Sequence, residues 1–183
     1  MKSHAMSFSS PMVRAILDDR KNTTRRPAKG KHFYHNGILL TENPCPYQVG
    51  DHIWAKETYG FNGALPESPQ CLLYKATTPD ALVRWHSGRF MRREYSRIEL
   101  EIAAIHLETL TDITNEAALD EGIEYVYQIA NQDWSKVKEP TTIMDDPRHA
   151  FLVFWNHLYA ARPWMHARMH PPVWVYQFEK VKL

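Results

Sequence analysis

Residues 96–107 read SRIELEIAAIHL, and this segment is the strongest strand candidate in the chain. It alternates apolar side chains with charged ones: Ile98, Leu100 and Ile102 against Arg97, Glu99 and Glu101. An apolar residue at every second position is typical of a β-strand that has one buried face. We therefore predict a strand here and a fold in which strands form the framework.

Three further segments have the composition of short strands. They are residues 52–59 (HIWAKETY), residues 71–77 (CLLYKAT) and the C-terminal residues 173–183 (VWVYQFEKVKL). The first of them follows Gly50-Asp51, a pair that is typical of a turn. Residues 27–50 contain several Pro and Gly residues, so we predict a loop there with at most one short strand.

Three helices are predicted from the residues that begin and end them. Ser10-Pro11 supplies an N-cap and a first helical residue, and the apolar spacing that follows ends near Arg20. A second helix begins after the N-cap Thr114 and ends at Gly122, and Asp146-Pro147 begins a third. Lys21 is therefore expected just beyond the end of the first helix.

The order of these elements favours an α+β fold. Short strands outnumber helices, and irregular stretches separate them instead of regular strand–helix–strand units. We predict a single domain over residues 1–183, with a small twisted sheet or barrel and helices packed outside it. Residues 124–147 show weak periodicity and are predicted to be an insertion in this domain.

The composition is that of an ordinary globular protein. Apolar residues make up 44% and charged residues 23% of the 183 residues, and the net charge is +1, so any basic surface must be local. The two cysteines lack the spacing of a metal site or disulfide framework, which favours a reduced, cytoplasmic protein. No apolar run is long enough to span a bilayer, and the N-terminus does not resemble a signal peptide.

Residues 20–27, RKNTTRRP, form a locally basic segment. Four of these eight side chains are cationic and two carry hydroxyl groups, although the whole chain is nearly neutral. Two interpretations are open for a segment that follows a helix. It is either a solvated helix end or one wall of a site that holds an anion or a base and uses Lys21 and Thr24.

A series of motifs resembles the ASCH family, especially its phage and prophage branch. In chain order the motifs are PMVRAIL, RK-x-x-TRR, C-P-Y-x-x-GD-x-I-W-x-x-ET, SRIELEI, LTDITNEAALDEG and PPVWVYQFE. The resemblance covers residues 8–183 except residues 124–147. It implies a PUA-like β-barrel, and it implies binding of RNA or modified bases, or hydrolysis of N4-acetylcytidine as in small bacterial members.

The resemblance also implies a set of catalytic residues. The lysine, the threonine three residues later and the glutamate late in a downstream helix fall on Lys21, Thr24 and Glu121. In this scheme Thr24 attacks the amide carbonyl, Lys21 takes the hydroxyl proton and Glu121 protonates the leaving amine. The implied enzyme is a metal-independent amidohydrolase of N4-acylated cytosine, as nucleoside or RNA, with no cofactor and no membrane partner.

The candidate binding residues are cations and one carboxylate. Arg25 and Arg26 flank the Lys-Thr pair, and Glu57 could accept a hydrogen bond from the exocyclic amine of cytosine. We predict that Trp54, on the opposite side of the same strand, is a core residue. A second cationic stretch could contact phosphates while its aromatic residues stack on bases; it contains Arg89, Arg92, Arg93 and Arg97 with Phe90 and Tyr95.

Two alternatives to the hydrolase stay open at this point. The chain could be a non-catalytic reader of RNA or modified nucleic acid that serves a phage, or it could be a ribonuclease. Convergence of Lys21, Thr24 and Glu121 in a closed pocket would favour the hydrolase. An open basic groove that runs from the pocket to residues 89–97 would favour the other two. The sequence gives neither the acyl preference nor the oligomeric state.

Overall fold

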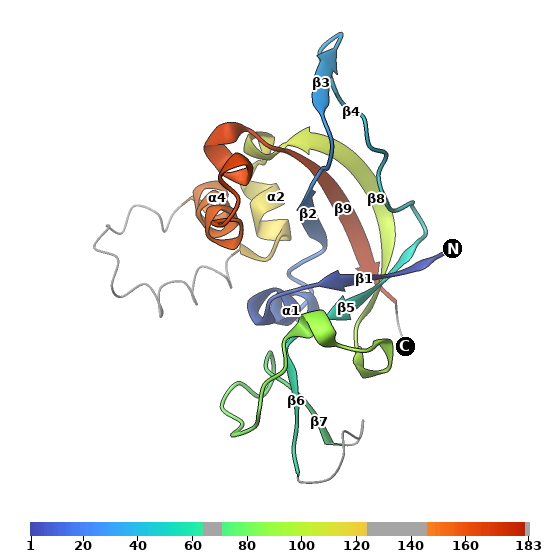
Figure 1. The fold of residues 1–183 in the computed structure, drawn as a ribbon, viewed down its shortest axis with the longest axis vertical. Helices are drawn as coiled ribbons and strands as arrows, with labels where there is room; N and C mark the ends of the chain where they lie inside the picture. The colour runs from blue at the N-terminus through green and yellow to red at the C-terminus, as the bar shows by residue number, and fades with distance from the viewer. Residues whose placement is uncertain (64–70, 124–145, 182–183) are drawn as a thin grey trace, which may run out of the picture.

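The computed structural model describes residues 1–63, 71–123 and 146–181 (Figure 1). Its centre is a five-stranded sheet in the order β1-β5-β8-β9-β2. The strands are β1 (Ser3–Ser7), β5 (His52–Lys56), β8 (Glu99–Thr109), β9 (Pro172–Lys180) and β2 (Thr23–Pro27). Only the β1–β5 pair is parallel among these five strands, and the other three pairs are antiparallel.

The predicted central strand is the longest one that the structure describes. β8 pairs with β5 at one end and with β9 along most of its length. A register shift between Ile102 and Ala104 marks a β-bulge, which bends a strand and increases its twist. The curvature of β8 and β9 in Figure 1 agrees with this irregularity.

The second and third helices begin after the predicted N-caps, whereas the first helix begins after Ser9 instead of Ser10 and ends at Leu17, before Arg20. They are α1 (Ser10–Leu17), α2 (Asn115–Asp120) and α4 (Pro147–Leu158). The Thr114 hydroxyl accepts a hydrogen bond from the Ala117 amide, and the Asp146 carboxylate accepts one from the His149 amide. α2 and α4 pack against each other beside β2 and β9 (Figure 1). None of the described helices is long and apolar enough to cross a membrane.

Within the described residues, five single-turn 3₁₀ helices connect the larger elements. They are η2 (Gly88–Phe90), η3 (Arg93–Tyr95), η4 (Leu110–Asp112), η6 (Pro163–Met165) and η7 (Ala167–Met169). Two of them, η2 and η3, occupy the cationic stretch from residue 89 to residue 97, which therefore has an ordered backbone instead of an open loop.

Two hairpins project from opposite ends of the molecule (Figure 1). One pairs β6 (Tyr59–Phe61) with β7 (Leu72–Tyr74). β7 lies within the strand candidate at residues 71–77, whereas β6 extends beyond the candidate at residues 52–59. The other pairs β3 (His32–His35) with β4 (Ile38–Thr41), where we predicted a loop with at most one strand. Asn36 and Gly37 form its turn with φ of 51° and 79°, the backbone conformation that an Asn-Gly hairpin turn requires.

The side chains of β9 show that both faces of the sheet are covered. Val173 and Val175 are buried on one face, and Tyr176 and Phe178 are buried on the other. Successive strand residues point to opposite faces, so the register of β2 with β9 assigns each β2 residue to a face. Arg25 pairs with Val175, whereas Thr24 pairs with Tyr176.

The structure confirms the α+β class but not the barrel. Over the described residues the sheet is open, and β1 and β2 are its two edge strands. The guanidinium of Arg26 connects these edges, since its Nη2 donates a hydrogen bond to the carbonyl of Ser7 at 2.8 Å. Of the predicted insertion, residues 124–145 lie outside the described part of the chain.

Candidate functional site

The end of α1 places Lys21 beside the end of α2. After α1 the backbone of Asp19 adopts a positive φ of 59°, and the amides of Arg20 and Lys21 both donate to the carbonyl of Ala15. This turn directs the chain against Glu121, with which Lys21 forms an isolated antiparallel bridge. Two segments that are 100 residues apart in the sequence therefore meet at the edge of the sheet.

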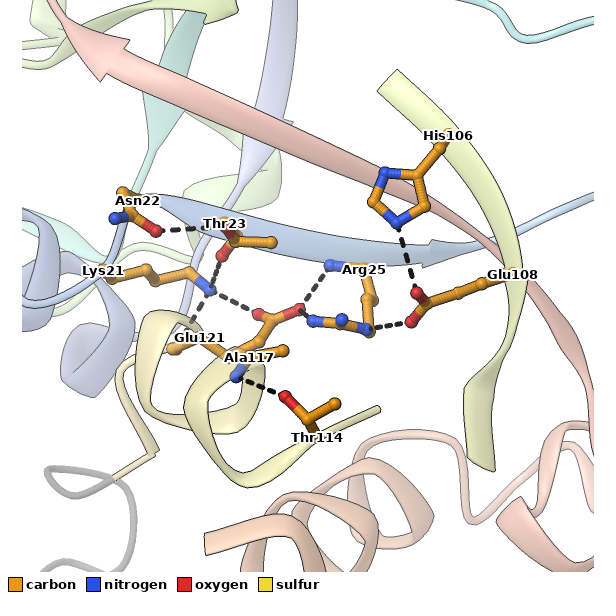
Figure 2. A network of polar contacts seen from close by, with 9 residues as sticks. All are labelled: Lys21, Asn22, Thr23, Arg25, His106, Glu108, Thr114, Ala117 and Glu121. Carbon is orange, nitrogen blue, oxygen red and sulfur yellow. Dashed lines mark hydrogen bonds and ion pairs between the residues drawn. The ribbon is translucent and has the colours of Figure 1, made fainter. Parts of the chain in front are cut away.

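The Lys21 ammonium is the centre of a buried polar network (Figure 2). Its Nζ donates to the carboxylate Oε2 of Glu121 at 2.5 Å, to the carbonyl of Thr23 at 2.5 Å and to the carbonyl of Glu121 at 3.0 Å. The side chains of Lys21 and Glu121 are only 1% and 5% exposed. Each of the three ammonium protons thus has an acceptor.

The second carboxylate oxygen of Glu121 binds Arg25. Oε1 accepts from the backbone amide of Arg25 at 2.6 Å and from its Nη1 at 3.3 Å. The Arg25 Nε donates at 2.7 Å to Glu108 on β8, and Glu108 also contacts His106 at 3.2 Å. Figure 2 shows Glu121 between the two cations, Lys21 and Arg25.

This network also completes the hydrogen bonding of an edge strand. β2 pairs with β9 on one side only, so the Thr23 carbonyl and the Arg25 amide point to its free edge. Lys21 and Glu121 supply the missing partners for these two backbone groups. Because unpaired buried backbone groups are costly, the network has a structural role whether or not it has a chemical one.

The environment of Lys21 lowers the pKa of its amine. Burial lowers the pKa of Lys21 below its usual range, the Glu121 carboxylate raises it, and the positive charges of Arg26 and Arg25 lower it further. A lysine with a lowered pKa can act as a base at a pH where an exposed lysine cannot.

Thr24 lies close to this network along the chain but not in it. Its side chain is buried, and among the described residues its hydroxyl has no hydrogen-bond partner. The register of β2 puts Thr24 on the same face as Arg26 and Tyr176, opposite to the face of Arg25. The structure therefore brings Lys21 and Glu121 together, with Thr24 at the adjacent position on the other side of the strand.

Glu57, which is buried, and Arg97, which is partly exposed, form a separate ion pair. The two nitrogens Nε and Nη2 of Arg97 donate to the two carboxylate oxygens of Glu57 at 2.9 and 3.0 Å. The Arg97 guanidinium also lies 4.0 Å from the centre of the Tyr74 ring. Burial raises the pKa of Glu57, and Arg97 opposes this rise. Both residues are thus occupied by each other, away from the Lys21 network.

The prediction for Trp54 was wrong about which face of β5 is buried. Ile53, Ala55 and Glu57 are the buried side chains, whereas Trp54 is half-buried and lies beneath the Lys56 and Arg93 cations. The alternation itself is as predicted. Burial of Glu57 depends on Arg97, a partner 40 residues away that the local pattern does not reveal.

The cationic residues of the second stretch have different surroundings. Arg92 pairs with Glu94, and Arg93 pairs with Glu99, both on the surface. Arg89 instead lines a cavity of about 530 Å³, together with Arg26 from β2. The predicted continuous basic stretch is therefore divided, and only Arg89 of these residues shares a cavity wall with the RKNTTRRP segment.

Several residues of these two sites were not predicted from the sequence. Glu108 extends the Lys21 network, and Lys56 and Arg162 line the cavity with Arg26 and Arg89. The alternation along residues 96–107 could have been followed one residue further, to Glu108. No local signal in the sequence places Arg162 near Arg26.

Comparisons with protein-family models, with curated proteins and with solved structures each give no match.

Proposed function

We propose that the protein is a metal-independent amidohydrolase that removes the acyl group from an N4-acylated cytosine. The observation that carries the proposal is the buried 2.5 Å contact between Lys21 Nζ and Glu121 Oε2. These are two of the three residues on which the motif resemblance puts the catalytic functions. The third, Thr24, is buried on β2 next to Thr23, whose carbonyl binds Lys21. Its hydroxyl forms no hydrogen bond with the described residues, so it is available to react.

The Lys21–Glu121 contact can supply a base and an acid together. Transfer of one proton from Nζ to Oε2 turns the ion pair into a neutral amine and a carboxylic acid. The next step requires the Thr24 hydroxyl, which lies on the face of β2 opposite to Arg25, to come within hydrogen-bond reach of Nζ. The amine then removes the hydroxyl proton while the hydroxyl oxygen attacks the acyl carbonyl carbon. When the carbon–nitrogen bond breaks, the Glu121 acid protonates the leaving amine of cytosine, and an acyl ester remains on Thr24.

Hydrolysis of that ester completes the cycle. A water molecule gives a proton to the Glu121 carboxylate and attacks the ester carbonyl. Thr24 then regains a proton from the Lys21 ammonium as the carboxylic acid leaves. Net consumption is one amide and one water. Arg26 lies on the Thr24 face of β2 and supplies positive charge where the oxyanion develops.

We further propose that the sheet is the curved wall of a PUA-like barrel of the ASCH type, in a cytoplasmic protein. The β-bulge in β8 supports the curvature, and the Arg26–Ser7 hydrogen bond brings the two edge strands within reach of one side chain. A barrel of this kind places the Thr24 face of β2 on its concave side.

A pair of Thr24 variants tests the hydrolase. Thr24→Val keeps the shape of this buried side chain without its hydroxyl, and Thr24→Ser keeps the hydroxyl. With N4-acetylcytidine and a metal chelator present, we expect the wild type and Thr24→Ser to release cytidine, whereas Thr24→Val is slower by about 10³-fold or more. Chromatography measures the product, and thermal unfolding checks that both variants are folded. Equal activity of Thr24→Val and the wild type would refute the mechanism.

A second candidate is a non-catalytic reader of modified nucleic acid. It is favoured by the complete hydrogen bonding of the Lys21 ammonium, which in this arrangement has no lone pair for a hydroxyl proton. The basic cavity that Arg26 and Arg89 line together also favours it. The same assay separates the two functions. A folded wild-type protein that binds acetylated cytidine or RNA without releasing cytidine is a reader.

A further inference from the structure

The cavity that Arg26 and Arg89 share has an unusual wall for a protein with a net charge of +1. Four cationic side chains line it: Arg26, Lys56, Arg89 and Arg162. None of its lining residues within the described chain is an aspartate or a glutamate. These cations come from four separate elements, β2, β5, η2 and the segment after α4, so the fold and not a local run of charge brings them together.

The described carboxylates do not neutralise this group. Arg25, Arg93 and Arg97 each form an ion pair with a glutamate, but no described aspartate or glutamate lies within ion-pair distance of the four cavity cations. Lys56 donates to the carbonyl of Arg89, and Arg26 donates to the carbonyl of Ser7. The Arg26 Nε is buried and has no hydrogen-bond partner in the residues described.

Concentrated charge of one sign destabilises a folded protein unless an anion compensates for it. The cavity also presents the hydroxyl groups of Ser7, Ser9, Thr58 and Ser87, which can bind anionic oxygens. The volume of about 530 Å³ suits a small-molecule ligand, and the Tyr159 ring on the wall provides a surface for a base.

We propose that this cavity binds the phosphate group of a nucleotide. Arg89 and Arg162 are exposed at the wall and can turn toward the phosphate oxygens, whereas Arg26 is half-buried and fixed by Ser7. The bound phosphate, with a charge of about −2, offsets part of the positive charge of the four cations and is held between the ends of β1 and α4. This site lies beside the Lys21 network and does not require that the protein hydrolyses an amide.

Binding by the full chain tests this site with cytidine 5′-monophosphate, cytidine and inorganic phosphate as probes in titration calorimetry. We expect the nucleotide to bind at least about tenfold more tightly than cytidine, with an affinity that falls as salt rises. Arg89→Gln/Arg162→Gln should weaken nucleotide binding by about 10-fold or more and leave cytidine binding unchanged. Arg168→Gln, an exposed arginine outside the cavity, is the control for a change in charge alone.

Equal affinity for cytidine and its monophosphate would overturn the proposal, and so would an equal loss of affinity in Arg168→Gln. Thermal unfolding without ligand gives an independent readout, because removing two uncompensated cations should not lower the melting temperature. A short oligocytidylate with and without a 5′-phosphate then distinguishes an RNA end from a free nucleotide as the source of the phosphate. The Thr24 variants decide hydrolysis separately, since these binding measurements involve no turnover.

Discussion

At the scale of single residues, the Lys21–Glu121 pair is where stability and chemistry overlap. Breaking a buried ion pair from one side leaves the other charge without its partner. We expect Lys21→Met and Glu121→Gln each to lower the free energy of unfolding by about 3 kcal/mol. In the double variant the loss should be smaller than the sum of the single losses by about 1–3 kcal/mol. Urea denaturation of the four proteins measures this coupling, and strict additivity would show that the contact contributes nothing to folding.

The sequence named the residues of this pair but not all of their contacts. The motif resemblance named Lys21 and Glu121, and the structure places their charged groups 2.5 Å apart. Nothing local indicated that Glu121 would also bind Arg25, or that the pair would complete the free edge of β2. The alternation through β5 predicted correctly that Glu57 and Trp54 lie on opposite faces, but not which face is buried. Burial of the Glu57 carboxylate depends on the distant cation of Arg97.

At the scale of elements, Gly122 holds α2 against α1 and Lys21. Its φ is +76°, and an added Cβ would lie 2.6 Å from the Ala15 Cβ and 3.2 Å from the Lys21 Cβ. We expect Gly122→Ala to lower the free energy of unfolding by about 2–4 kcal/mol, from backbone strain plus the clash with the short Ala15 side chain. Because the clash displaces Lys21, any amidohydrolase activity should fall as well.

Gly37→Ala is the matched control for this prediction. Gly37 has a similar φ of +79° in the β3–β4 turn, but an added Cβ there meets no atom within 4 Å. It should therefore show the backbone cost alone, about 1 kcal/mol. Chemical denaturation compares the two variants, and equal losses would mean that the contact of Gly122 with α1 does not matter.

The elements themselves were predictable to different degrees. The starts of α2 and α4 and the end of α2 were predicted well because Thr114, Asp146 and Gly122 are local signals that act through local hydrogen bonds or backbone conformation. The start and the end of α1 each lie earlier in the chain than predicted. The β3–β4 hairpin was missed although Asn36-Gly37 is a strong turn signal, since the strands beside it lack a buried face. The order of strands and the open edges of the sheet depend on long-range pairing, which no local pattern specifies.

At the scale of the whole molecule, buried tyrosines link stability to alkaline pH. Burial raises the pKa of Tyr176, Tyr47 and Tyr159, which lie on different elements around the core. Above pH 10.0, the ordinary value for tyrosine, the unfolded chain loses phenol protons that the folded protein retains. The folded state then binds more protons, so stability falls as pH rises. Because the pKa of Lys21 is lowered in the folded protein, Lys21 makes stability rise with pH instead. This effect ends near pH 10.5, where the lysine of the unfolded chain is itself deprotonated.

Tyr176→Phe isolates one part of this alkaline loss. The phenol contacts only the Cys45 thiol, at 3.5 Å, among the described side-chain hydrogen-bonding groups, so at neutral pH the variant should be within about 1 kcal/mol of the wild type. Above pH 10.0 the variant should lose stability less steeply, because one fewer phenol has to ionise on unfolding. Urea denaturation at a series of pH values measures both slopes, and phenolate absorbance shows whether ionisation accompanies unfolding. Parallel curves for the two proteins would mean that Tyr176 ionises in the folded state as readily as in the unfolded chain.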